Sequence, residues 1–327
     1  MGLNKRNGKR PPRLCCLNID LDPLDHYFSV RGYEPNPGTR LNAVYEDALP
    51  RFLDLFGEYG VKATFFVVGR DLKRPDNRRM IRRAAEAGHE IANHTQNHIQ
   101  TYGGLSPQEK REEIIECHHS IAEATGSEPK GFRAPGWSAD IETMKILVEM
   151  GYEYDSSVFP SFLITPISYV NWFLNRRRVS RFLNQPLLGL APKKPYRPSV
   201  ECVWKRGGMN IVELPLSILP VVQLPFMGTI LFLWGRPVFN LSLLWMRLYR
   251  RPLNYILHGI ELVDYYREIN DERLDSKPGI KYVLEDKVAL YRFMITKFKP
   301  FSNFATLREL AFSQARQREE IDDSSGY

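Results

Sequence analysis

The dominant feature of this sequence is a regular alternation of short apolar runs with longer segments whose apolar residues recur at helical spacing. Strands are expected within residues 13–20, 61–69, 89–95, 130–136, 152–158, 210–216 and 254–263, and helices within residues 41–60, 77–88, 106–126 and 139–151. Strands that alternate with helices usually pair in parallel beneath a layer of helices. The order therefore predicts an α/β fold, a distorted (β/α) barrel of about seven parallel strands. No glycine-rich phosphate loop follows any strand, so a nucleotide-binding fold has no support.

This alternation defines a single domain over residues 13–316, flanked by two charged tails. Residues 1–12 are basic and are expected to be disordered, and residues 317–327 form an acidic tail. The alternation breaks at about residues 160–210, where basic and proline-rich stretches indicate an insertion that lies over one face of the domain.

Residues 211–251 are unusually apolar, and two interpretations of them stay open. A membrane-spanning helix needs about 20 uninterrupted apolar residues, and prolines and polar residues interrupt this segment, so a spanning helix is not expected. The first interpretation is a buried strand, a loop and a packed helix. The second is a surface that lies against a membrane peripherally, with Arg247, Arg250 and Arg251 facing phosphates.

The N-terminal residues, the cysteines and the net charge limit the compartments and the binding partners that are expected for this chain. The first residues contain no apolar run that would indicate a secretory signal, and the four cysteines form no paired framework, so a cytoplasmic location is expected, or one at the inner face of the membrane. The net charge of +7 is spread over 327 residues and no recognition motif accompanies it, so nucleic acid is not an expected partner.

Scarce reactive side chains fall where the predicted strands end. In a parallel β/α barrel, the carboxyl ends of the strands meet at one rim, which is where such barrels carry out their chemistry. The residues expected at this rim are Asp20, Asp22, His94, His98, Arg133, Pro135, Trp137, Asp155 and His258. Two imidazoles and one carboxylate, from His94, His98 and Asp22, would bind a divalent metal and leave positions open for water. Alternatively, the histidines are surface residues, and Asp20 and Asp22 cap a loop before Pro23.

The neighbouring groups suggest a hydrolytic site. Asp20 would remove a proton from a metal-bound water, and Arg133 would pair with Asp20 and keep it ionised. His258 would protonate a leaving nitrogen, with Asp155 as a candidate to orient its ring. Thr95 is expected to brace the loop between the two histidines, and whether His26 is a further ligand stays open.

Five motifs occur in the order NIDLD, HTQNH, RAPGW, YDSS and ILH. In this order they resemble the motifs of the polysaccharide deacetylases, carbohydrate esterase family 4, which includes rhizobial chitooligosaccharide deacetylase. The resemblance covers about residues 14–312. It implies a distorted β/α barrel and a divalent metal, most often zinc, with cobalt, nickel or manganese as alternatives. The residues it implies are Asp22, His94 and His98 as ligands, Asp20 as base, His258 as acid, Arg133 to position the base, and Trp137 and Leu257 to shape the pocket, with Pro135 beside them.

Two motifs depart from the usual family pattern. The spacing of the aspartates in NIDLD looks like that of the subgroup that includes the lipid-linked aminoarabinose deformylase. YDSSVFP lacks the usual tryptophan and arginine, which leaves the role of Asp155 open.

The expected function is a metal-dependent hydrolase that removes an N-acetyl or N-formyl group from an amino sugar. That sugar would belong to a cell-envelope polysaccharide or to a saccharide linked to a polyprenyl phosphate. The alternative is a non-catalytic carbohydrate-binding protein on the same scaffold, which predicts that the base or a metal ligand is missing.

Overall fold

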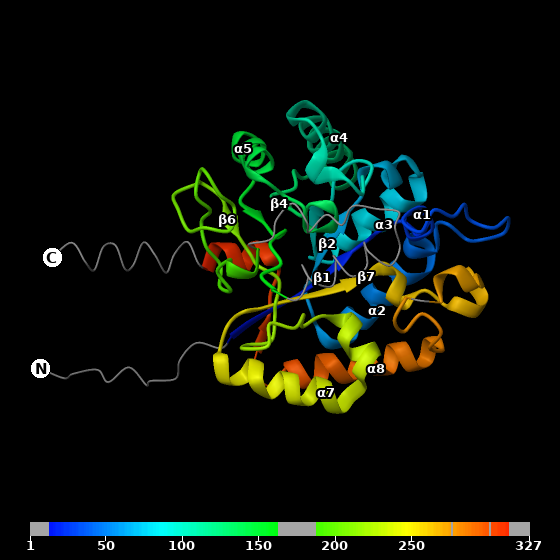
Figure 1. Cartoon of the computed structure of the whole chain (residues 1–327). Coiled ribbons are helices and arrows are strands. Elements are labelled where there is room, and N and C mark those ends of the chain that lie inside the picture. The colour runs from blue at the N-terminus through cyan, green and yellow to red at the C-terminus, as the bar shows by residue number, and fades with distance from the viewer. Residues whose placement is uncertain (1–12, 163–187, 276, 301, 314–327) are drawn as a thin grey trace, which may run out of the picture.

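A computed structural model describes residues 13–162, 188–275, 277–300 and 302–313 of the chain. Its centre is one parallel sheet with the strand order β6-β5-β4-β3-β2-β1-β7, and β8 also pairs with β1 (Figure 1). The strands are β1 Arg13–Asp20, β2 Thr64–Val67, β3 Glu90–Asn93, β4 Gly131–Phe132, β5 Tyr154–Asp155, β6 Val212–Glu213, β7 Leu253–His258 and β8 Ser302–Phe304. The sheet curls into a half-barrel with helices around it, which confirms the predicted distorted (β/α) barrel and its seven predicted strands.

Helices flank the sheet, and four of them were expected from the helical spacing of apolar residues. The helices are α1 Leu24–Ser29, α2 Leu49–Tyr59, α3 Pro75–Glu86, α4 Pro107–Thr125, α5 Ile141–Glu149, α7 Gly228–Tyr249 and α8 Leu284–Phe298. Local signals set their ends. Ser106 and Glu109 form a capping box at the start of α4, and Gly126 ends it with a φ of 75°, a conformation that glycine adopts without strain.

The alternation of side chains along β1 separates the outer core from the interior of the half-barrel. Leu17 and Ile19 are fully buried in the large cluster formed by the sheet and its outer helices. Asn18 faces the other way, and its amide donates to Asn254 Oδ1 on β7 at 2.8 Å. Because successive side chains of a strand point to opposite faces, Asp20 lies on the same interior side as Asn18, at the carboxyl end of the strand.

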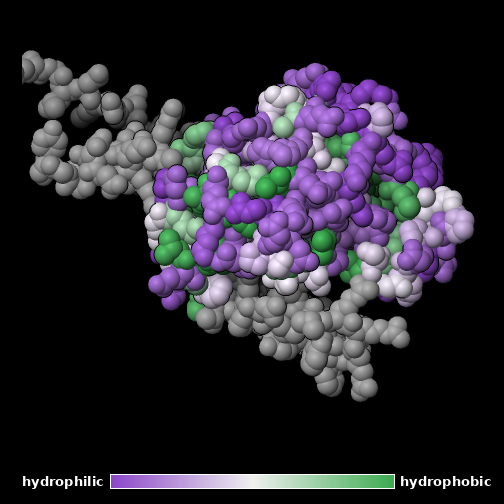
Figure 2. All heavy atoms as spheres, turned by 90° about the horizontal axis from the view of Figure 1, so that it is seen from above, coloured by the Kyte–Doolittle hydropathy of each residue, from purple (hydrophilic) through white to green (hydrophobic). Residues whose placement is uncertain are grey.

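The segment 211–251 folds as β6, a loop and the helix α7, as the first interpretation of the apolar run expected. α7 is assigned over 22 residues, but Gly235 breaks it with a non-helical φ of 68° and ψ of −171°, two residues before Pro237, so the apolar run is interrupted there as the sequence predicted. By length and composition, α7 could cross a membrane, although 39% of its most apolar stretch is buried against the protein. It lies on the opposite side of the molecule from α4 and α5, whose face is mostly hydrophilic (Figures 1 and 2).

Much of the predicted insertion, and both charged tails, lie outside the described residues. The described part of the insertion joins the edge of the sheet through an antiparallel bridge between Tyr196 and Glu213 of β6.

Candidate active site

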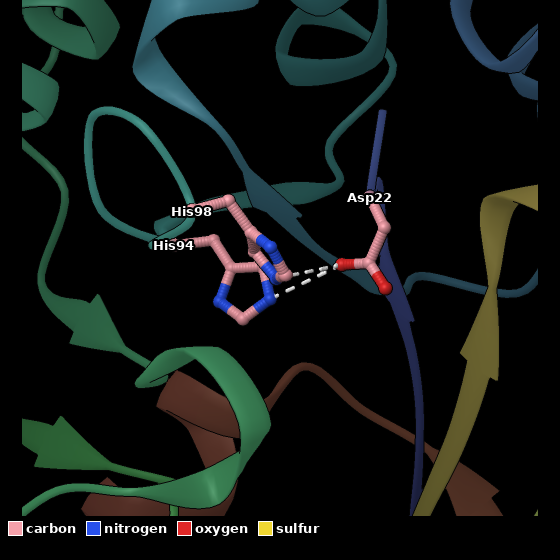
Figure 3. A group of neighbouring side chains, drawn as sticks. All are labelled: Asp22, His94 and His98. Carbon is pink, nitrogen blue, oxygen red and sulfur yellow. Dashed lines mark ion pairs between the residues drawn. The ribbon is translucent and has the colours of Figure 1, made fainter. Parts of the chain in front are cut away.

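The carboxyl ends of β1 and β3 bring together three side chains that could hold a metal ion. Asp22 follows β1 by two residues, and His94 and His98 follow β3, so all three reach the same point at the rim of the half-barrel (Figure 3). One ligand atom from each lies within 4.8 Å of the others, and all three residues are buried. Nε2 of His94 is 3.3 Å from Asp22 Oδ1, and Nε2 of His98 is 3.2 Å from the same oxygen.

The hydrogen bonds of the two imidazoles leave their Nε2 atoms facing Asp22. His94 Nδ1 lies 2.7 Å from the carbonyl oxygen of Arg133, which can only accept, so Nδ1 carries the proton and Nε2 keeps a lone pair. His98 Nδ1 lies 2.9 Å from Nδ1 of His26. Metal-binding histidines are oriented by such contacts at the other ring nitrogen, and both rings here have one.

The loop that carries the histidines has an unusual backbone conformation. Thr95 and His98 have positive φ values of 65° and 52°, which residues other than glycine seldom adopt. The Thr95 hydroxyl accepts from the backbone N–H of His98 at 3.2 Å, and the backbone N–H of Thr95 donates to Asn93 Oδ1 at 2.8 Å. These bonds hold the strained loop, as strained backbone at ligand sites requires.

The environment of Asp22 fits a bound cation. Its Oδ2 accepts from the Tyr27 hydroxyl at 3.2 Å, whereas its Oδ1 is buried and has no hydrogen-bond donor among the described residues. An ionised buried oxygen that faces two imidazole lone pairs is stabilised by a metal ion.

Asp20 lies beside this group and is paired with Arg133. The Asp20 Oδ1 accepts from Arg133 Nη1 at 2.5 Å, and its Oδ2 is 3.9 Å from Nε2 of His94. Arg133 is fully buried, its Nε donates to the carbonyl of Ser156 at 2.9 Å and its Nη2 to the Ser156 hydroxyl at 3.0 Å. Its guanidinium also stacks 4.0 Å from the centre of the Phe66 ring. The sequence-predicted pair is therefore present, with one carboxylate oxygen held by the arginine and the other turned toward His94.

His258 ends β7 directly beside Asp20, since these two residues are Cα partners in the parallel pairing of β1 and β7. Its ring contacts a carboxylate, but this carboxylate belongs to Glu261, whose Oε1 is 3.4 Å from His258 Nδ1. The expectation that Asp155 orients His258 is therefore wrong. Asp155 is buried and accepts from the Ser157 hydroxyl at 2.6 Å.

Glu261 is fixed in place behind His258. Its Oε2 accepts from the backbone N–H of His258 at 3.1 Å and from the Tyr291 hydroxyl. Burial raises the pKa of Glu261, but the hydrogen bond and charge of His258 outweigh burial, and the pKa lies below its usual value. An ionised Glu261 places the proton of a neutral His258 on Nδ1 and leaves Nε2 for a substrate.

The predicted pocket residues are only partly where the sequence placed them. Leu257 is fully buried in the outer core with the helices and does not face the site. The side chain on the interior side is that of Ile256, which packs in a small cluster with Phe159 and the half-buried Trp137. Trp137 and Phe159 meet edge to face, 5.0 Å between ring centres, and Pro135 is buried at the start of the same turn, Pro135–Trp137.

Sequence reasoning missed three contributors to the site: Tyr27, Glu261 and the orienting contact of His26. Glu261 follows His258 by three residues and Tyr27 follows Asp22 by five. Each lies in a short helical turn directly after a site residue. Titratable residues in the first turn after a strand-end ligand are the signal that would have identified them.

The chain is similar to polysaccharide deacetylases. Residues 39–154 match the model of the polysaccharide deacetylase family, a stretch that contains His94, His98 and Arg133. A peptidoglycan deacetylase from Helicobacter pylori is 28% identical over 148 residues, covering 44% of this chain and 49% of that protein. A peptidoglycan-N-acetylglucosamine deacetylase from Bacillus cereus is 36% identical over 142 residues, covering 42% and 63%. A chitooligosaccharide deacetylase from Sinorhizobium fredii is 33% identical over 131 residues, covering 37% and 58%.

The matched regions thus span between about half and just under two thirds of the length of these relatives. Two solved structures share the fold over almost the whole chain. A proposed polysaccharide deacetylase from Mycobacterium smegmatis superposes with a TM-score of 0.59 at 20% identity, covering 94% of this chain and 92% of that one. Puue allantoinase superposes with a TM-score of 0.56 at 16% identity, covering 93% of each chain.

Proposed function

We propose that this chain, which carries a polysaccharide deacetylase domain, is a metal-dependent hydrolase that removes an N-acetyl or N-formyl group from an amino sugar. The observation that carries the proposal is the convergence of Asp22, His94 and His98 beside the Asp20–Arg133 pair. Two imidazoles and one carboxylate, with no further ligand in this group among the described residues, suit catalytic zinc, and cobalt, nickel or manganese could replace it. A bound divalent ion would polarise the acyl carbonyl and lower the pKa of a water molecule.

Asp20 has the geometry of a general base in this proposal. Arg133 occupies its Oδ1, which leaves Oδ2 on the side of His94 to accept a proton from the attacking water. The buried guanidinium is itself fixed by Ser156, so Asp20 is positioned before substrate binds. Arg133 therefore acts through Asp20 as a positioning residue.

His258 has the geometry of a general acid. It approaches from β7, the strand beside β1, and its Nδ1 faces Glu261. In the doubly protonated ring, Nε2 is then the nitrogen that would deliver a proton to the sugar amine as it leaves, and the Glu261 carboxylate offsets the charge of that imidazolium. Trp137 and Ile256 supply an apolar wall near the site, suited to the small acyl group.

The deacetylase relatives act on peptidoglycan or chitooligosaccharides, as their names state. We therefore place the amino sugar in a cell-envelope polysaccharide or its precursor. A narrower proposal is a saccharide carried on a polyprenyl phosphate at the inner membrane face, which the exposed apolar residues of α7 support. The alternative of a non-catalytic carbohydrate-binding protein is not favoured, because Asp20, Asp22, His94, His98 and His258 are all present at the rim.

The test is release of acetate or formate from N-acylated amino-sugar oligomers, including N-acetylglucosamine oligomers. The protein is first treated with a chelator and then supplied with zinc or cobalt. We expect activity to vanish with the chelator and to return with the metal. The matched variant is Asp20→Asn, which should bind metal as the wild type does but lose turnover. Sugar binding without turnover under every metal condition would instead support the non-catalytic alternative.

A further inference from the structure

The outer face of α7 exposes a row of large apolar side chains. They are Leu233, Trp234, Val238, Leu241, Leu244, Trp245, Leu248 and Tyr249, with exposed fractions from 36% for Trp245 to 71% for Leu248. After the break at Gly235, Val238, Leu241, Trp245 and Leu248 follow one another at intervals of three, four and three residues, which places them on one side of a continuous helical stretch. An exposed apolar face of this extent marks an interaction surface.

The opposite side of α7 is fixed in the protein core. Phe232, Phe239, Leu243 and Met246 are buried in the cluster that also contains β7 and α8. Phe239 packs against the rings of Tyr255 and Phe298, with ring centres 6.4 Å and 5.7 Å away. A helix held by one side against the domain cannot be surrounded by lipid, so the exposed side is suited to lie on a surface and not to span a bilayer.

The charges on this helix are all positive. Residues Gly228–Arg251 contain four arginines and no aspartate or glutamate. Arg236, Arg247 and Arg250 are exposed, and Arg251 lies 5.6 Å from the centre of the Tyr249 ring. Arginine beside tryptophan and tyrosine on an apolar helix is the composition of segments that lie in the interface of an anionic membrane.

The described chain begins at Arg13, which contacts the C-terminal end of α7. Residues 1–12 contain four lysines and arginines and no acidic residue. The chain then enters β1 at Arg13, whose Nη1 donates to the backbone carbonyl of Met246 in α7 at 2.7 Å.

We propose that the outer face of α7 docks the protein on the surface of a membrane that contains anionic lipids. A second copy of the chain is a poorer occupant. A two-fold dimer through this face would place the same patch opposite itself, and arginines would meet arginines with no carboxylate on either helix to offset them. Anionic headgroups supply that missing charge, and the acyl region accepts the apolar row.

The experiment is flotation of the full-length protein with lipid vesicles. We expect binding to vesicles that contain phosphatidylglycerol, weaker binding to phosphatidylcholine alone, and a decrease as salt is raised. The double variant Leu244→Asp/Leu248→Asp should lower the vesicle affinity by at least about tenfold. Arg247→Ala/Arg250→Ala should lower it by about tenfold or more and weaken the salt dependence. The control Val200→Asp changes an exposed apolar residue away from α7 and should float like the wild type.

Equal flotation of the wild type and both double variants would overturn the proposal. The proposal would also be overturned if the wild type did not float and had the mass of a dimer in solution, and if Leu244→Asp/Leu248→Asp had the mass of a monomer. The metal-ligand variant Asp22→Asn should float like the wild type. Docking can therefore be confirmed or rejected whether or not the protein proves to be a hydrolase.

Discussion

Glu261 lies behind His258, with its Oε1 3.4 Å from the imidazole Nδ1 and its Oε2 accepting from the backbone N–H of the same histidine. The glutamate thus fixes both the position of the residue and the tautomer of its ring. We expect Glu261→Gln to lower kcat by at least about tenfold, because the amide does not stabilise the imidazolium that a general acid requires. Steady-state hydrolysis of an N-acylated amino sugar measures the effect.

The conservative variant Glu261→Asp separates orientation from charge. It retains a carboxylate but shortens the side chain, so it should keep more activity than Glu261→Gln. A thermal unfolding curve is needed for each variant, since Glu261 also binds Tyr291 and Thr229. If all variants retained wild-type kcat, His258 would not act as the acid.

His26 contacts the metal-site histidine His98, with 2.9 Å between their Nδ1 atoms. Residues that orient a metal-bound imidazole contribute about 10–100-fold to metal affinity. We expect His26→Leu to weaken zinc binding by this factor, measured by calorimetry with the metal-free protein. His119→Leu replaces an exposed histidine on α4 and is the matched control. An unchanged dissociation constant for His26→Leu would show that the contact has no role in metal binding.

Arg133 and Asp20 form a buried ion pair in which the charge of each group is compensated by the other. Removal of one partner of a buried pair leaves an uncompensated charge, at a cost of about 3–5 kcal/mol. We therefore expect Arg133→Met to lower the free energy of unfolding by about that amount and to abolish activity. Urea unfolding of the metal-free protein measures the first effect.

The double variant Asp20→Asn/Arg133→Met tests whether this cost comes from the orphaned carboxylate. It should be more stable than Arg133→Met alone, because the buried negative charge is absent. Additive losses in the two single variants would mean that Arg133 stabilises the fold through Ser156 and Phe66 instead.

The sequence was sufficient for the sheet and the metal-site residues because both depend on local patterns. Short apolar runs that alternate with helical patterns define the strands, and the carboxyl-end rule of parallel sheets then places Asp20, Asp22 and the His94–His98 loop at one rim. Strand β8 was not predicted, since Ser302–Phe304 has only three residues and is a strand only through its pairing with β1.

Errors at the site arose where side-chain direction decides the contact. Leu257 and Ile256 are adjacent apolar residues of β7, and only the side-chain alternation fixed by pairing with β1 shows that Ile256 faces inward. Asp155 and Glu261 are both acidic residues near the predicted strand ends. The chain turns back after His258 and delivers Glu261 to its ring, a contact that no periodicity in the sequence reveals.

His89 provides a pH-dependent contribution to stability away from the active site. The imidazole is buried, and its Nδ1 accepts from the backbone N–H of Ala63 at 3.1 Å, which requires the neutral ring. Burial, with a smaller effect of Lys62, lowers the pKa of His89 from 6.5 to about 4. Below pH 6.5, His89 of the unfolded chain binds a proton, whereas His89 of the folded protein stays neutral down to about pH 4. The free energy of unfolding therefore decreases as the pH falls from 6.5 to about 4.

We expect this loss to be about 2 kcal/mol between pH 7 and pH 5. Urea unfolding of the wild type and of His89→Gln at both pH values measures it. The variant lacks the titrating ring, so its stability should fall less over this range, while the exposed-residue control His119→Gln should follow the wild type. Other buried groups contribute equally to the pH dependence of the wild type and of His89→Gln, so their effect cancels in the comparison. Asp71 is one such group: burial raises its pKa to about 7, so its contribution to stability increases as the pH falls. Parallel pH dependences for the wild type and His89→Gln would show that the buried ring does not resist protonation.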